Sequence, residues 1–373
     1  MRFRFSLIFL SAFISCNQQV KQEPEKPQIP LSDIMAAPVT VAFSSKSANA
    51  FESYFSDLFS HRHFNGNILM SSGDSLYENS YGFASFDTKD SLNINTSFQL
   101  ASTSKPFTAT ATMMLFEKGK INLDSTVNAY IKEFPYRGVT IKMLLSHTSG
   151  LPNYMHLTDT LWKDKTIQMC NDDIICFLRD CKPAAAGKPG EFFEYCNTNF
   201  AVLAVVIEKA SGLPFRDFIK NNIFDKVGMT HTFIVNEDSS AFKYSIATGH
   251  NVMLSEKEPH YHDGIYGDKG VYSTVHDLFL FSRALSTGYL IKPATLKMMC
   301  EPQVTPKAYG KSYGLGFRMM NMEGKKWIYH NGWWHGFRAY FWNNFEEKKC
   351  FIALTNTTRD GYLKEEEIIP MLH

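Results

Sequence analysis

Strand-forming patterns lie at both ends of this chain and helical patterns fill its middle, and this order constrains the fold most. Residues 64–85 predict two strands around a Ser-Ser-Gly-Asp turn, and apolar segments within residues 313–357 predict further strands. From Ser102 to about residue 230 helical segments dominate, and two of them stop at or near a glycine. We therefore predict an α+β fold: an antiparallel sheet completed by the C-terminal part, flanked by helices and carrying a large, mostly helical insertion.

The folded part of the chain starts near residue 48, where Phe51, Phe55 and Phe59 share one face of a predicted helix. Of the 373 residues, 44% are hydrophobic, which is ample for a sizeable core. Residues 17–33 are rich in Gln, Pro, Lys and Glu and have no apolar period, which is typical of a disordered tether. The predicted organisation is a signal peptide at 1–16, a tether at 17–47 and one domain at 48–373, with an α/β part at about 48–100 and 265–373 and a helical part at about 101–264.

The first sixteen residues have the features of an export signal. Arg2 and Arg4 precede an apolar run, residues 5–14, that is too short to span a bilayer as a helix. The run ends at Cys16, which resembles a bacterial lipoprotein signal and implies that Cys16 becomes the lipidated first residue. An ordinary cleaved signal peptide with an incidental cysteine is the alternative. Both interpretations predict export to the bacterial cell envelope, and the first predicts a membrane-anchored lipoprotein that faces the periplasm or the exterior.

Charge and cysteine patterns exclude several function classes. The formal net charge is +1 and both signs are interspersed, unlike the basic surface of a nucleic-acid-binding protein. The six cysteines after Cys16 form no C-x-x-C pair, so the sequence has no zinc or thioredoxin pattern, and disulfide pairing stays open. The histidines in residues 61–63 and 260–263 lack metal-site spacing and are interpreted as solvated loop residues. We therefore predict no metal and no organic cofactor.

Ser102 and Lys105 are the first candidate pair for chemistry. If a helix starts at Ser102, residues three apart share a face, so the amine can lie beside the hydroxyl, and Pro106 is tolerated in a first helical turn. The positive end of the helix dipole and burial would both favour a neutral amine, which can act as a base. Taken alone, the pair is more typical of a capping serine beside a solvated lysine. The same spacing recurs at Ser240 and Lys243.

Tyr195 and Asn197 are the second candidate pair, where a Pro-Gly turn and an aromatic strand lead into a predicted helix. A phenol beside an amine can relay a proton, and an amide side chain can hold a substrate amide. A helix cap at Asn197 is the simpler alternative. The same spacing recurs at Tyr77 and Asn79, within a predicted hairpin.

The third candidate is the His-Asn-Gly triplet at residues 330–332, where a strand is predicted to end. Its glycine would let a substrate approach the backbone of an edge strand. A similar triplet occurs at residues 262–264, so the motif is not diagnostic by itself. Only Ser102, Tyr195 and His330 each sit at the junction that their role requires, namely a helix start, a turn into a helix and a strand end.

Together with their surroundings, these motifs resemble the serine β-lactamase and penicillin-binding-protein superfamily. The closer resemblance is to its branch of class C β-lactamases, D-Ala-D-Ala carboxypeptidases and family VIII esterases. The similar segments follow the family order and span the chain from about residue 48 to its end: residues 98–131, 139–154, 189–215, 227–233, 270–285 and 313–317. The resemblance implies a β-lactamase/transpeptidase-like fold and a serine hydrolase that works through an acyl-enzyme.

The resemblance also implies a role for each matching residue. Ser102 would be the nucleophile, Lys105 its partner base, and Tyr195 a group that assists proton transfer to the leaving group. The substrate-binding set would be Asn197 for the substrate amide, His330 and Gly332 of the third motif, and Trp333, whose backbone N–H would form an oxyanion hole with that of Ser102. His147 would belong to the scaffold and satisfy local backbone groups.

The third motif departs from the Lys-Thr-Gly or Lys-Ser-Gly that family β-lactamases usually have. A histidine is only partly charged at neutral pH, so His330 would attract a substrate carboxylate less strongly than lysine. D-amino-acid peptidase or esterase activity on small peptides or esters is therefore favoured over β-lactam hydrolysis, with peptidoglycan as a candidate partner. The alternative is a protein that binds penicillin or peptidoglycan with little turnover. Ser312, in a Gly-x-Ser-x-Gly segment, is not expected to be a nucleophile because a strand follows it.

Overall fold

The structure is a computed structural model that describes residues 45–73, 75–235, 245–305, 311–359 and 362–372. The signal with Cys16, nearly all of the tether and the Ser240–Lys243 repeat of the serine–lysine spacing lie outside these residues. Across the described ranges, no helix combines the length and the apolar character needed to cross a bilayer.

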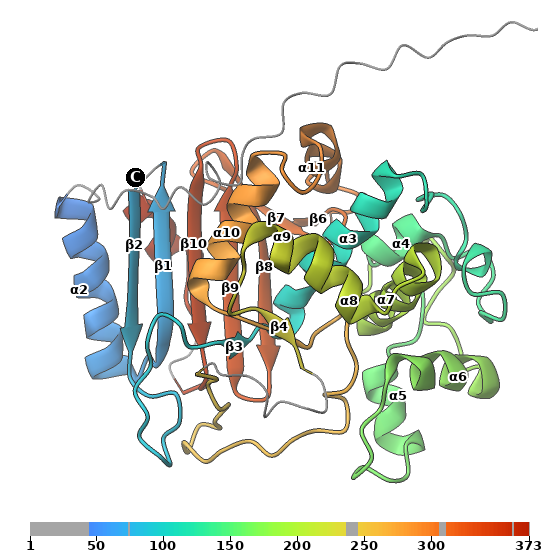
Figure 1. Ribbon diagram of the computed structural model, residues 1–373, viewed down its shortest axis with the longest axis horizontal. Helices are drawn as coiled ribbons and strands as arrows, with labels where there is room; N and C mark the ends of the chain where they lie inside the picture. Colours follow the sequence, from blue (N-terminus) through green and yellow to red (C-terminus); the bar gives the residue numbers. More distant parts are fainter. Residues whose placement is uncertain (1–44, 74, 236–244, 306–310, 360–361, 373) are drawn as a thin grey trace, which may run out of the picture.

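A seven-stranded antiparallel sheet forms the centre of the molecule (Figure 1). Its strand order is β2-β1-β10-β9-β8-β7-β6, so the N-terminal hairpin joins the C-terminal strands through the β1–β10 pair. This confirms the predicted sheet that the C-terminal part completes. The strands are β1 (Gly66–Ser72), β2 (Ser75–Tyr81), β6 (Ser312–Tyr313), β7 (Arg318–Met322), β8 (Lys325–Trp334), β9 (Phe337–Asn344) and β10 (Lys349–Thr355).

Helices cover both faces of this sheet. Neighbouring residues of a strand point to opposite sides, so the apolar strands in the middle of the sheet present side chains that must be covered on each face. Trp342 of β9 packs in a cluster with Phe51 and Phe55 of α2 (Ser45–Arg62) and with the C-terminal α12 (Glu365–Ile368) and η5 (Ile369–Leu372). The adjacent Phe341 stacks on Phe281 of α10 (Val275–Ser286) on the other face, at a ring-centroid distance of 6.0 Å. Phe59 was expected on the buried face of α2, but Leu58 takes that place and Phe59 is 43% exposed.

The helical part lies to one side of the sheet (Figure 1) and is centred on α3 and α7. Both helices are buried along most of their length, which explains why their sequences are apolar nearly all round. The elements are η1 (Ala101–Ser104), α3 (Lys105–Glu117), η2 (Val127–Ala129), α4 (Ile141–Leu145), α5 (Tyr154–Leu161), α6 (Asn171–Cys181), α7 (Asn197–Ser211), α8 (Phe215–Ile219), η3 (Lys220–Phe224) and α9 (Asp225–Val227), with α11 (Pro293–Met299) following α10.

A small three-stranded sheet links this helical part to the large sheet. It consists of β3 (Phe98–Gln99), β5 (Val271–Ser273) and β4 (Phe233–Ile234), with β5 in the middle. Because β3 and β5 are antiparallel, the residues that follow β3 lie beside those that precede β5. Ser102 follows β3 and Asp268 precedes β5, so this pairing brings two distant segments to the same place.

Two local strand predictions are wrong. Residues 191–196 form no strand, because their backbone bonds to the 147–150 turn instead; the N–H of Glu194 donates to the carbonyl of His147. Residues 314–317 form a turn before β7, closed by a bond from the N–H of Gly314 to the carbonyl of Phe317. Gly316 has a φ of 84° and abuts Ala109 of α3 so closely that a Cβ would overlap it.

Candidate active site

Ser102 and Lys105 lie where the 3-10 turn η1 passes directly into α3. Ala101, just before them, has a φ of 49°, a left-handed conformation that is strained for a residue other than glycine. Pro106 occupies the first turn of α3, where its missing N–H costs no hydrogen bond. Ser102 is half-buried and Lys105 is completely buried. The local fold therefore presents the hydroxyl to the surface and encloses the amine.

Three oxygen atoms surround the amine of Lys105. Its Nζ lies 3.0 Å from Oγ of Ser102, 2.8 Å from Oδ1 of Asn197 and 3.0 Å from the backbone oxygen of Asp268. An ammonium donates three hydrogen bonds, whereas a neutral amine donates two and keeps one lone pair. When the amine is neutral and Asn197 and Asp268 accept its two N–H groups, its lone pair points at the hydroxyl of Ser102. That is the geometry a base needs to take the hydroxyl proton.

The ring of Tyr195 also lies beside the amine of Lys105. Its centroid is 4.9 Å from Nζ of Lys105. The ring also packs against the imidazole of His147 in a tilted arrangement, at a centroid distance of 4.4 Å. Among the described residues, none shares a hydrogen bond with the hydroxyl of Tyr195, so that group is available to a substrate.

His147 is a buried scaffold residue, as predicted. Its Nδ1 accepts a hydrogen bond from the backbone N–H of Cys196 at 3.1 Å. Burial, helped by the positive charges of Lys105 and Arg318, lowers the pKa of His147 well below its usual value. The neutral ring therefore fixes the segment that carries Tyr195 without adding charge to the site.

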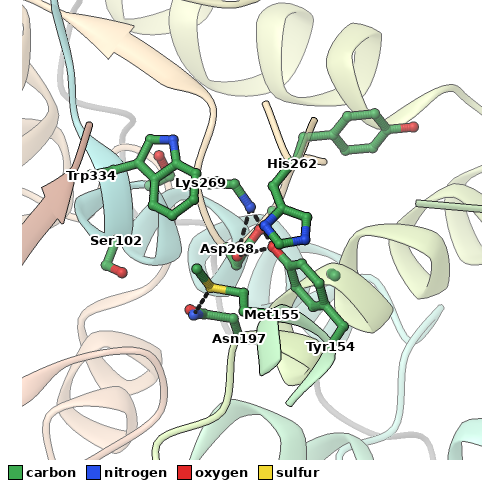
Figure 2. A network of polar contacts seen from close by, with 12 residues as sticks. Ser102, Tyr154, Met155, Asn197, His262, Asp268, Lys269 and Trp334 are labelled. Carbon is green, nitrogen blue, oxygen red and sulfur yellow. Dashed lines mark hydrogen bonds and ion pairs between the residues drawn. The ribbon is translucent and has the colours of Figure 1, made fainter. Parts of the chain in front are cut away.

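Asn197 is the first residue of α7, but its side chain does not cap the helix, so the simpler alternative is wrong. Its Oδ1 accepts from Lys105 and its Nδ2 donates to the sulfur of Met155 on α5 (Figure 2). A thioether is a weak acceptor, so the N–H can exchange it for a substrate carbonyl at little cost. The oxygen of this amide is thus bonded to the amine of Lys105, whereas its N–H group can bind a substrate in place of Met155.

The third motif lies on β8, beside η1. β7 pairs with β8 only as far as Tyr329, so residues 330–334 have a neighbour strand on one side only, as an edge strand does. The strand itself continues to Trp334 and does not end at the motif as predicted. Gly332 packs so tightly on the turn that a Cβ would overlap the carbonyl oxygen of Leu100. This approach sets the backbone around residue 333 next to the turn that carries Ser102.

His330 differs from its expected state. It is completely buried, with Nε2 at 3.3 Å from the hydroxyl of Tyr313. Burial, together with the charges of Arg318 and Lys105, lowers its pKa well below the usual value. The expectation of a partly charged imidazole is wrong, because the ring is fully desolvated among cations. The side chain of Trp333 is 64% exposed and does not fill the site.

Arg318 on β7 is a site residue that the sequence analysis missed. Its Cζ lies 4.9 Å from the ring centroid of Tyr195 and 5.7 Å from that of Tyr313. It is half-buried, and no acidic side chain within the described ranges forms an ion pair with it. The sequence feature that could have identified Arg318 is its position directly after residues 313–317, one of the segments that resemble the family. Asp268 was also missed, since it contributes through its backbone.

The repeats of the second and third motifs, at Tyr77 and His262, lie in the described part of the chain. Tyr77 of the β1–β2 hairpin packs against Phe51 of α2, on the sheet face opposite α10, so the structure separates it from the site. The prediction of a solvated His262 is wrong. This residue is 1% exposed, its Nε2 lies 2.7 Å from Oγ1 of Thr158, and its ring packs edge-on against Tyr154 near the site (Figure 2). It is buried because its loop folds onto α5.

The remaining candidates stay apart from catalysis. Ser312 is followed by a turn and by strand β7, not by the helix of a nucleophile elbow. His61 is exposed and pairs with Asp57. In the described ranges, no three histidine, cysteine or acidic residues lie close enough to hold a metal ion. The six described cysteines are all free.

Known proteins are similar in sequence to most of this chain. Penicillin-binding protein 4* of Bacillus subtilis (strain 168) is 35% identical over 324 residues, which cover 83% of this chain and 72% of that protein. A D-aminopeptidase of Brucella anthropi is 23% identical over 292 residues, covering 77% of this chain and 55% of that enzyme.

Solved structures show the same fold. The octameric penicillin-binding protein homologue from Pyrococcus abyssi superposes with a TM-score of 0.73 at 25% identity, covering 83% of this chain and 74% of that one. A class C beta-lactamase does so with a TM-score of 0.73 at 18% identity, covering 88% and 95%, a likeness that shows the fold alone. The family model described as Beta-lactamase matches residues 68–368, a range that contains η1, the start of α7 and β8. The chain therefore belongs to the beta-lactamase family, which includes hydrolases of amide and lactam bonds.

Proposed function

We propose that this protein is a serine hydrolase that cleaves small peptides beside a free carboxylate. Oγ of Ser102 attacks the amide carbonyl while the amine of Lys105 takes the hydroxyl proton. The tetrahedral intermediate collapses when the leaving amine accepts a proton through Tyr195, which leaves an ester on Ser102. Water then attacks the ester, the acyl group leaves as an acid, and Ser102 regains its proton.

The position of the Arg318 guanidinium beside Tyr195 is the observation that supports this choice of substrate. The buried, neutral His330 offers no charge, so Arg318 is the cation beside Tyr195 that a carboxylate can reach. A guanidinium binds a carboxylate through two parallel hydrogen bonds. The relative named D-aminopeptidase supports D-configured peptides as the class to test first.

The test compares a D-Ala-D-Ala peptide with its C-terminal amide. We expect the wild-type protein to favour the acid by about 10- to 100-fold in kcat/KM, as one charged hydrogen bond of about 1.5–3 kcal/mol predicts. Arg318→Gln should remove the preference and leave p-nitrophenyl ester hydrolysis intact. Arg283→Gln, at an arginine whose guanidinium also lies near an aromatic ring, is the matched control. Equal turnover of acid and amide by the wild-type protein would refute this substrate class.

A binding protein with slow turnover is the second candidate, and the names of the penicillin-binding relatives favour it. Fluorescent penicillin separates the two functions. A stable adduct with no release of product supports the binding protein, whereas continuous nitrocefin or peptide turnover supports the hydrolase. Ser102→Ala should abolish labelling in both cases.

We also propose export with a lipid anchor at Cys16, supported by the signal-like residues 1–16. Expression with a labelled fatty acid tests it. The label should enter the wild-type protein and be absent from Cys16→Ser. An unlabelled wild-type protein in the soluble envelope fraction would support the ordinary signal peptide.

A further inference from the structure

Tyr154, Asp268 and Lys269 form a buried polar cluster (Figure 2). It adjoins the amine of Lys105, which lies 3.0 Å from the backbone oxygen of Asp268. The side chains are 0%, 1% and 4% exposed. The hydroxyl of Tyr154 donates to Oδ2 of Asp268 at 2.8 Å, and Nζ of Lys269 lies 3.3 Å from the same oxygen. Nζ of Lys269 also hydrogen-bonds to the hydroxyl of Tyr154. Each group therefore contacts the other two.

Burying this cluster is unfavourable for the stability of the folded protein. Removing two charges from water costs several kcal/mol per ion, and an apolar replacement is often as stable. Burial and the carboxylate of Asp268 raise the pKa of Tyr154 well above its usual value. Burial lowers the pKa of Lys269, and the carboxylate of Asp268 opposes that decrease. Oδ1 of Asp268 is buried and has no hydrogen-bond partner among the described residues. These costs call for a role beyond packing.

The role follows from what Asp268 does with its backbone. Its carbonyl oxygen is one of the three oxygen atoms around the amine of Lys105, at 3.0 Å, while its side chain is held from α5 by Tyr154. The next residue of α5, Met155, contacts Nδ2 of Asn197, whose Oδ1 is another acceptor of Lys105. Helix α5 thus supports both acceptors of the neutral amine, each through one side chain.

We propose that Tyr154, Asp268 and Lys269 are positioning residues that hold the carbonyl of residue 268 against the amine of Lys105. The proposal rests on the proposed function of Ser102 and Lys105. A neutral amine with two fixed acceptors has only one direction left for its lone pair, which is toward Oγ of Ser102. If the carbonyl moves, the amine can rotate and the lone pair leaves the hydroxyl. The loss then falls on the acylation step and leaves substrate binding unchanged.

The experiment measures acylation by fluorescent penicillin in single-turnover time courses over a range of concentrations. Tyr154→Phe removes one hydroxyl, and Asp268→Asn keeps the shape of the side chain but removes its charge. We expect the limiting rate constant to fall by about 10- to 100-fold, the usual effect of a misplaced catalytic group. The half-saturating concentration should stay within about twofold.

Tyr54→Phe is the matched control, because the hydroxyl of Tyr54 also donates to a carboxylate, that of Glu367, at 2.7 Å on the other face of the sheet. It should acylate at the wild-type rate. The rate constant comes from the shape of the time course, so a smaller folded fraction changes only the amplitude. Wild-type rate constants in both Tyr154→Phe and Asp268→Asn would overturn the proposal. Labelling of Ser102→Ala would instead overturn the proposed function, so the two failures are distinct.

Discussion

Replacing Gly332 by alanine should push β8 away from the turn that carries Ser102. The added methyl group would overlap the carbonyl oxygen of Leu100 and lie 3.1 Å from Oγ1 of Thr103 and 3.2 Å from Cβ of Ala101. Backbone and short side chains cannot swing aside, so the strand or the turn must shift. The backbone N–H groups of residues 102 and 333, which we expect to bind the oxyanion, belong to these two segments.

The size of the effect follows from this crowding. Relieving the overlap requires a shift of about 1 Å, and a misplacement of that size can cost about 10²-fold in rate. Loss of one oxyanion donor costs a similar amount, about 10²- to 10³-fold in kcat. Forcing a methyl group into a packed contact lowers the free energy of unfolding by about 1–3 kcal/mol. We therefore expect acylation to slow by about two orders of magnitude in a protein that still folds.

Single-turnover labelling with a fluorescent penicillin or a fluorophosphonate measures the rate constant, and thermal unfolding measures the stability. Gly324→Ala is the control at the opposite end of β8. Its φ is 74° and no atom lies near its Cβ position, so alanine strains the backbone there without touching the site. It should lower the Tm and leave the acylation rate constant unchanged. A wild-type rate constant in Gly332→Ala would refute the tight approach of β8 to Ser102 as a requirement for catalysis.

Three further predictions concern other groups. Tyr195→Phe should slow acylation by about 10²- to 10⁴-fold without changing the half-saturating concentration, in the same time courses, and a wild-type rate would exclude proton transfer through this phenol. His262 has its pKa lowered to about 3 by burial and by the charge of Lys269, so below about pH 6.5 the unfolded state binds a proton that the folded state does not. The titration of His262 alone should therefore lower the free energy of unfolding by about 1.4 kcal/mol per pH unit from about pH 6.5 toward pH 3, in addition to the effects of His147 and His330, and urea titrations should show a shallower fall in His262→Gln; equal slopes contradict the burial of a neutral ring. A thiol reagent followed by mass spectrometry should modify the exposed cysteines in the folded protein and the buried ones only after unfolding: Cys170, Cys176 and Cys181 against Cys196, Cys300 and Cys350.

The parts of the fold that the sequence predicts are those that local patterns determine. The strand patterns of 64–85 and 313–357 gave the sheet, and the apolar runs after Ser102 and Asn197 gave α3 and α7. The contact between Ser102 and Lys105 also depends on local spacing alone, since residues three apart meet in any helical turn. These predictions needed no knowledge of what packs against each element.

The features that the sequence did not reveal depend on distant segments. The carbonyl of Asp268 has no side-chain signature, because every residue carries the same acceptor. The charge of His330 depends on complete burial, which Tyr313 and the neighbouring strands create. His262 was misjudged for the same reason, since its polar loop folds onto α5.

The position of Arg318 relates substrate recognition to proton transfer. Its guanidinium and the amine of Lys105 lie at the same distance, 4.9 Å, from the centre of one ring, that of Tyr195. If Arg318 holds the substrate carboxylate as proposed, it places the leaving amine of a peptide near the phenol that is proposed to protonate it. On the same proposal, a substrate without that carboxylate should still acylate Ser102, but its leaving group would not be held in place. For this reason the loss of Arg318 should lower kcat as well as raise KM for acidic peptides, and a change confined to KM would separate the two roles.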